Sequence, residues 1–121
     1  MKSALNWFEI PVTDIDRAVR FYERALGGPL RRETFGAEPM AMFASKDPGV
    51  GGALVKGPQR VPGATGTIVY LDAAGRLDEI VSAIPAAGGT VLVGKLDIGD
   101  PGFIAVFRDT EGNTVGLHQP R

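Results

Sequence analysis

The chain has 121 residues, a net charge of −1 and no cysteine. A domain of this length can bury enough surface to fold without disulfides, and its near-neutral charge offers no basic field for nucleic acid or an anionic membrane. The lack of cysteine excludes disulfides, thiolate metal sites and a cysteine nucleophile. Because the first residues contain no long apolar run, we expect neither a signal peptide nor a membrane span, and hence a cytoplasmic protein.

The first predicted elements are a strand and a helix. Apolar residues occupy every second position from Phe8 to Val12, which is the period of a strand with one face under a helix. Asp14 stands where a helix N-cap would accept backbone amides. An apolar stripe at helical spacing then continues to Gly27-Gly28, where the helix should end.

The second half repeats this order. The glycine pair Gly27-Gly28 recurs 61 residues later as Gly88-Gly89. Between them, 67–73 reads as a strand and 77–84 as a helical stripe, with Pro85 expected to shorten or kink the last turn. The same offset aligns "AMFAS" with "GFIAV" and "GGALVKG" with "GNTVGLH". We therefore predict a single domain over 1–121, with two strand–helix–strand–strand–strand modules at about 5–57 and 66–119 and a surface linker at about 58–65.

Two segments resemble a known superfamily. The opening "NWFEIPVTDIDRAVRFYERALG" and the closing "FRDTEGNTVGLH" are similar to the vicinal oxygen chelate superfamily, which includes glyoxalase I, bleomycin-resistance and fosfomycin-resistance proteins and extradiol dioxygenases. The resemblance covers nearly the whole chain. It implies an α+β fold in which two βαβββ modules form a curved mixed sheet, an open cup with the ligand inside.

The resemblance also assigns four positions to metal ligands. Here they hold Trp7, Val55, Ile68 and Gly116. None of these side chains offers the lone pair that a divalent ion needs, so we expect a metal-free cup without a cofactor. Gly116 would leave room in that cup, and Trp7 would either provide a flat wall for a planar ligand or belong to the core.

Several other side chains are candidates for the cup. Strand alternation places Glu9, Tyr70, Asp72 and His118 on its inner face. Glu9 could act as a general base while Tyr70 or His118 donates to an oxyanion, or the three could form only a structural network. Met42, on the same side of its strand as Met40, could line an adaptable pocket or fill the core. The segment "LDIGDPGF" (96–103) could fold over the rim as a lid.

Three functions remain open at this point. The first is a glyoxalase/bleomycin-resistance-like protein that binds a small, partly apolar molecule in a metal-free cup. The second is a glyoxalase-like lyase or isomerase of the lactoylglutathione-lyase type with Glu9 as base, and the third is a dimeric stress or regulatory protein without catalysis. Whether the chain is an enzyme stays open. The resemblance implies a homodimer, with modules that pair within one chain or swap between two.

Overall fold

The two halves of the chain fold into the same order of elements. The structure is a computed structural model that describes residues 3–121. The first module contains β1 (Trp7–Pro11), α1 (Ile15–Leu26), β2 (Arg31–Phe35), β3 (Glu38–Met42) and β4 (Gly51–Val55). The second contains β5 (Tyr70–Asp72), α2 (Leu77–Ala87), β6 (Thr90–Asp97), β7 (Phe103–Arg108) and β8 (Thr114–Gln119). Over 3–121, no helix is long and apolar enough to cross a membrane.

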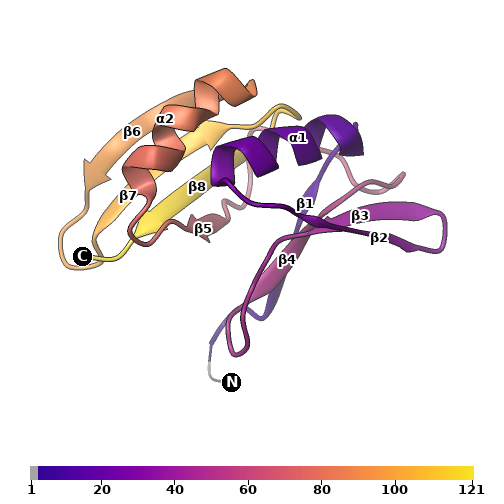
Figure 1. Cartoon of the computed structure of the whole chain (residues 1–121), viewed down its shortest axis with the longest axis horizontal. Helices are drawn as coiled ribbons and strands as arrows, with labels where there is room; N and C mark the ends of the chain where they lie inside the picture. The colour runs from indigo at the N-terminus through magenta and orange to yellow at the C-terminus, as the bar shows by residue number, and fades with distance from the viewer. Residues whose placement is uncertain (1–2) are drawn as a thin grey trace.

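Each module forms its own four-stranded mixed sheet. The strand orders are β1-β4-β3-β2 and β5-β8-β7-β6, with β1–β4 and β5–β8 parallel and the other neighbours antiparallel. Figure 1 shows the second-module sheet on the left, the first-module sheet on the right and both helices along the top. The predicted α+β fold with two βαβββ modules is confirmed, and the strands belong to two separate sheets rather than to one.

The helix ends follow the sequence signals. The Asp14 carboxylate accepts a hydrogen bond from Arg17 N at 3.0 Å and caps α1. Gly27 and Gly88 end the two helices with φ of 79° and 107°, the left-handed conformation that glycine adopts without a steric penalty. Pro85 does not end α2, which continues two residues further to Ala87.

Strand β5 is shorter than the predicted 67–73. It pairs only with β8, from Tyr70 opposite Gly116 to Asp72 opposite His118. On either side of these residues the pairing extends by a single backbone hydrogen bond, from Gly116 N to the Val69 carbonyl at 2.9 Å and from Ala73 N to the His118 carbonyl at 2.8 Å. The chain therefore joins the sheet only shortly before Tyr70.

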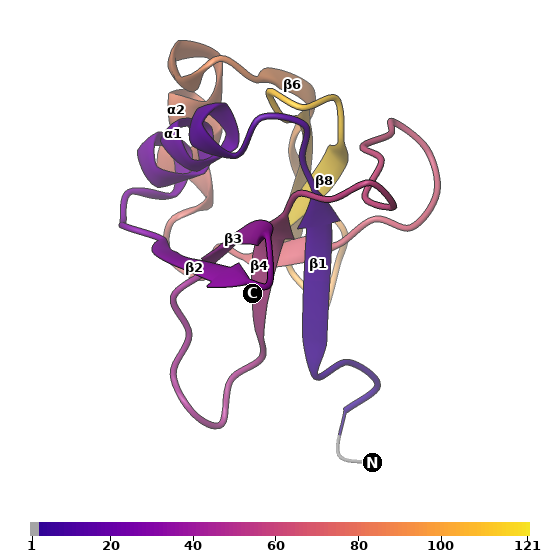
Figure 2. The ribbon, with the colours of Figure 1, turned by 90° about the vertical axis from the view of Figure 1, so that its right-hand side faces the viewer.

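One apolar core joins the two modules. Phe21 and Tyr22 of α1 lie edge to face, with ring centroids 4.9 Å apart, and both contact Phe107 of β7. Because α1 belongs to the first module and β7 to the second, neither module buries its apolar face alone. Figure 2, turned by 90°, shows both helices on the same side of the molecule.

A polar turn between β7 and β8 fastens the modules together. The buried carboxylate of Asp109 accepts a hydrogen bond from the Tyr22 hydroxyl at 2.7 Å, and the Asn113 amide donates to the Pro11 carbonyl at 2.7 Å. Burial raises the pKa of Tyr22 well above its usual range, and the negative charge of Asp109 adds to this effect. The turn thus links the second module to β1 and α1 through groups that water does not reach.

Glu111, in the same turn, makes several further contacts with the first module. Its carboxylate accepts hydrogen bonds from Thr13 N and Asp14 N at 2.9 and 2.8 Å, and from Arg17 Nε at 2.7 Å. Burial alone would raise the pKa of this carboxyl, whose side chain is 0% exposed. Arg17, the two backbone amides and the Thr110 hydroxyl outweigh burial and lower the pKa to about 2. A negative charge at the start of α1 also suits the helix dipole.

Candidate functional site

The first candidate site is a hollow of about 380 Å³ on the first-module sheet. We call it the first hollow; its lining residues are Trp7, Glu9, Glu38, Met40, Met42, Val55, Lys56 and Arg60. Strand alternation explains why Trp7 and Glu9 both line this hollow. The two residues share one face of β1, while Ile10 is buried on the other face. Met42 lines the hollow, and Ala41 beside it lies in the core.

Glu9 does not stand free in this hollow. Arg60 Nη1 lies 2.9 Å from Glu9 Oε1, and the indole Nε1 of Trp7 donates to Glu9 Oε2 at 3.3 Å. The Glu9 side chain is 28% exposed. A carboxylate paired in this way is a weaker base toward a substrate proton than an unpaired one, because Arg60 stabilises its charged form.

Arg60 is a site residue that the sequence analysis missed. It lies in the linker, between β4 and β5, which was interpreted only as a surface connection. No strand or helix period passes through this segment, so no pattern indicates where its side chains point. Contacts that are distant in sequence fix its course, such as the hydrogen bond from Gly63 N to Asn113 Oδ1 at 3.1 Å.

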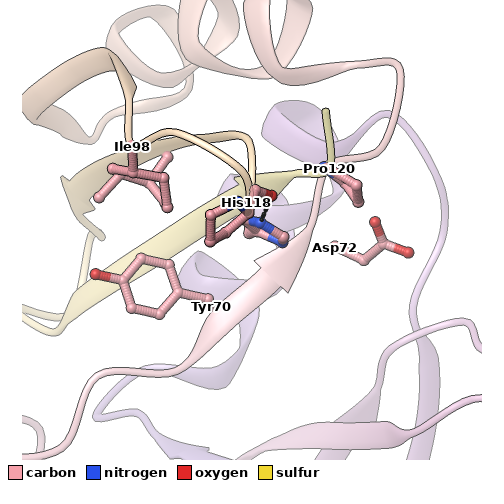
Figure 3. A pocket seen from close by; sticks show the side chains of 7 residues that line it. Tyr70, Asp72, Ile98, His118 and Pro120 are labelled. Carbon is pink, nitrogen blue, oxygen red and sulfur yellow. Dashed lines mark hydrogen bonds between the residues drawn. The ribbon is translucent and has the colours of Figure 1, made fainter.

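The second candidate site is a hollow of about 540 Å³ on the second-module sheet. This second hollow is lined by Tyr70, Asp72, Ile98, Pro101, Ile104, His118 and Pro120. Figure 3 shows the Tyr70 ring and Ile98 on one side of His118 and Asp72 on the other. Ile98 and Pro101 come from the segment proposed as a lid, and His118 Nε2 lies 2.7 Å from the Pro101 carbonyl oxygen.

The two hollows are separate within one chain. They share no lining residue, and no strand of one sheet pairs with the other among residues 3–121. Within one chain, Glu9 therefore lines one hollow and Tyr70 and His118 line the other. Alternation along each strand places each side chain on a face, but the shared core sets how the two sheets are placed relative to each other.

Glycines form the floor beneath the two exposed aromatic rings. A Cβ atom on Gly116 would lie 2.8 Å from Tyr70 Cγ and closer still to the ring edge, so the Tyr70 ring rests on the bare backbone of β8. On the other sheet, a Cβ on Gly51 would lie 3.3 Å from Trp7 Cζ3. The space that the sequence analysis assigned to Gly116 is thus occupied by Tyr70.

The strand register changes one of the four superfamily metal positions. Glu9 pairs with Ala53, and its counterpart Tyr70 pairs with Gly116. The residue of the first module that corresponds to Gly116 is therefore Ala53. The constant offset of 61 residues between the modules, which predicted Val55 for this position, is wrong by two residues here. The offset changes because the connections between the strands differ in length in the two modules.

The corrected set still does not fit a metal ion. Trp7, Ala53, Ile68 and Gly116 carry no donor atom in their side chains, or only the indole N–H, which cannot coordinate a cation. Ile68 also precedes β5 and is 39% exposed. Within 3–121, no group of three or more His, Asp or Glu residues lies close enough to hold a metal.

Comparison with known proteins places this architecture in a family. The family model "Glyoxalase/Bleomycin resistance protein/Dioxygenase superfamily" matches residues 4–117. The chain belongs to this superfamily. Among curated proteins, this glyoxalase-superfamily chain is 28% identical over 126 residues to "Putative glyoxylase CFP32" of Mycobacterium tuberculosis and of Mycobacterium bovis. The match covers 94% of the chain but only 44% of the relative, so the chain spans less than half the length of the curated relatives it matches.

Solved structures show the same fold. A glyoxalase/bleomycin resistance protein from Albidiferax ferrireducens T118 has a TM-score of 0.76 at 19% identity, with 98% of this chain and 100% of that chain covered. UcmS2 is 29% identical, with a TM-score of 0.69 and 98% of each chain covered. TnmS3, an antibiotic binding protein from Streptomyces sp. CB03234, is 25% identical, with a TM-score of 0.70 and coverage of 98% and 97%.

Proposed function

We propose that this glyoxalase-superfamily protein binds a small, planar, partly apolar molecule against its two exposed aromatic rings, without a metal ion. The observation that carries the proposal is the exposure of Trp7 and Tyr70, 41% and 46%, each of which lines a hollow and packs against a glycine. Aromatic faces left open in a concave site gain most from stacking on a flat ligand. The antibiotic-binding relative TnmS3 and the lack of donors at the metal positions support this function.

We further propose that two copies of the chain complete the cup. Each hollow is open and lies on a separate sheet, so a ligand in either one is covered on one side only. The second module also exposes a set of large apolar side chains on β6 and just after it, namely Leu92, Val93, Leu96 and Ile98. A homodimer in which the first hollow of one copy faces the second hollow of its partner would cover this apolar surface and bring the two rings together.

Ligand binding can be measured through Trp7, the only tryptophan of the chain. A planar aromatic antibiotic or metabolite that binds should quench its emission with a saturable curve and raise the melting temperature. Trp7→Leu has no tryptophan left, so its binding is measured by titration calorimetry; it should be about fivefold weaker, because aromatic stacking contributes on the order of 1 kcal/mol beyond the buried area. The matched control is Val61→Ala, since Val61 is 76% exposed and lies outside both hollows. A screen of such compounds without a hit would refute the proposal.

A mixing experiment tests whether the cup is shared between copies. Trp7→Leu damages only the first hollow and Tyr70→Leu only the second. When the two variants are unfolded together and refolded, a mixed dimer with shared cups contains one intact site and one doubly damaged site. Recovery of tight binding in the mixture supports shared cups, whereas binding no better than either variant alone, or a monomeric mass in sedimentation, contradicts them.

A glyoxalase-like lyase is the second candidate. The presence of Glu9 in the first hollow and the similarity to CFP32 favour it. In that case Arg60→Ala should raise turnover of a hemithioacetal, because it frees the Glu9 carboxylate, and Glu9→Gln should abolish that turnover. Equal, negligible turnover by the wild type and both variants, with and without added Ni²⁺ or Zn²⁺, would exclude this activity.

A further inference from the structure

We propose that the second hollow binds a protonated amine, with Asp72 as its charged partner, on a ligand whose body is aromatic or apolar. The inference deepens the proposed function and rests on it, because it names the chemical class of the small molecule. It follows from the groups that surround this hollow, which offer negative charge and acceptor atoms but no Lys or Arg side chain.

Among residues 3–121, Asp72 is the only carboxylate that lines the second hollow. Its Oδ1 accepts a hydrogen bond from Ala74 N at 2.9 Å, and no Lys or Arg forms an ion pair with it in the part of the chain that the structure describes. Glu9 in the first hollow is different, because Arg60 neutralises it at 2.9 Å. An exposed carboxylate that borders an apolar hollow and has no ion-pair partner in the protein favours a cationic ligand group.

His118 adds an acceptor to the same hollow. Its Nε2 lies 2.7 Å from the Pro101 carbonyl oxygen, which can only accept, so Nε2 carries the hydrogen of this bond. In the neutral ring, Nδ1 is then a lone-pair acceptor. No Lys or Arg lines this hollow to attract an anionic ligand, whereas an ammonium group can donate to the Asp72 carboxylate or to His118 Nδ1.

The remaining walls suit the body of such a ligand. The Tyr70 ring packs against the backbone at Gly116 and lines the hollow, where an aromatic ring can interact with a cation or with another ring. Ile98 and Ile104 line the hollow with apolar surface (Figure 3). The hollow of about 540 Å³ is large enough for a fused two-ring system that carries an aminomethyl group.

Three probes with the same body isolate the charge preference. Isothermal titration at pH 8 would compare 2-naphthylmethylamine, 2-naphthylmethanol and 2-naphthylacetate against the full chain. We expect the amine to bind about fivefold more tightly than the alcohol, because a good partly exposed ion pair contributes about that factor in affinity. The anionic probe, 2-naphthylacetate, should bind most weakly. Asp72→Asn, which keeps an acceptor for Ala74 N, should reduce the amine preference to less than about twofold. Asp72→Ser provides a second variant if the first one folds poorly.

The control and the outcomes separate this inference from the proposed function. Asp78→Asn removes a carboxylate of equal charge from α2, outside the hollow, and should leave the preference unchanged. If the wild type binds the amine and the alcohol equally, or Asp72→Asn keeps the preference, the amine site is refuted and small-molecule binding stands. If none of the three probes binds the wild type, the proposed function fails for this ligand class and the amine site fails with it.

Discussion

Glu111→Gln tests the link between the two modules most directly. The native carboxylate is buried and accepts hydrogen bonds from Thr13 N, Asp14 N and Arg17, so a neutral amide there loses the charge that these donors face. Hydrogen bonds to a charged group contribute about 1.5–3 kcal/mol each in such substitutions. Because the Arg17 side chain is 46% exposed and can be rehydrated, we expect a loss of about 2–3 kcal/mol of unfolding free energy at pH 7.

The pH dependence of stability gives a second, independent value for the contribution of the Glu111 carboxylate to the free energy of unfolding. The pKa of Glu111 falls from its ordinary 4.5 in the unfolded chain to about 2 in the fold. The carboxylate therefore stabilises the native state fully above pH 4.5 and progressively less as the pH falls toward 2. Since one unit corresponds to 1.36 kcal/mol, the contribution lost across this window is about 3 kcal/mol.

Urea unfolding at several pH values between 7 and 2.5 measures both the stability lost in Glu111→Gln at pH 7 and the stability that the wild type loses on acidification. The stability of wild type should fall steeply below pH 4.5, and the Gln variant should show a smaller slope over the same window. Glu33→Gln, in an exposed ion pair with Arg31 at 3.5 Å, is the matched control and should change stability by less than about 0.5 kcal/mol. A Glu111→Gln loss below 1 kcal/mol with an unchanged slope would refute the role assigned to this link.

Three further predictions concern the core, the ring platform and metal. Tyr22→Phe removes a donor from buried Asp109 and should cost about 1–3 kcal/mol in urea unfolding; no loss would show that the other donors to this carboxylate suffice. Gly116→Ala should displace the Tyr70 ring and weaken binding of a planar ligand about tenfold, as titration of that ligand would show, whereas Gly94→Ala, with open space around the added methyl, should not. Elemental analysis of protein purified without chelator should find less than one equivalent of divalent metal, and EDTA should leave the melting temperature unchanged; a full equivalent would contradict the metal-free site.

The sequence predicted the local structure well wherever apolar residues recur with a strand or helix period, or a capping residue marks the end of a helix. The repeat of strand, helix and three strands, the Asp14 cap and the glycine helix ends are all present. These features depend on neighbouring residues, because alternation and capping act over one turn or one strand. The faces of Trp7, Glu9 and Tyr70 follow from the same alternation, which is why each of them lines a hollow.

Tertiary structure decided which of these side chains meet. The fixed offset gave Val55 where the strand pairing gives Ala53, because the length of the connections, rather than the repeat, sets the register. The entry of Arg60 into the first hollow depends on contacts between the linker and the β7–β8 turn, which no local pattern encodes. The separation of Glu9 from Tyr70 and His118 arises because one core, with Phe21 and Phe107 in contact, fixes the two sheets relative to each other. Short-range periodicity therefore determined which way each side chain faces, and only long-range packing decided its partners.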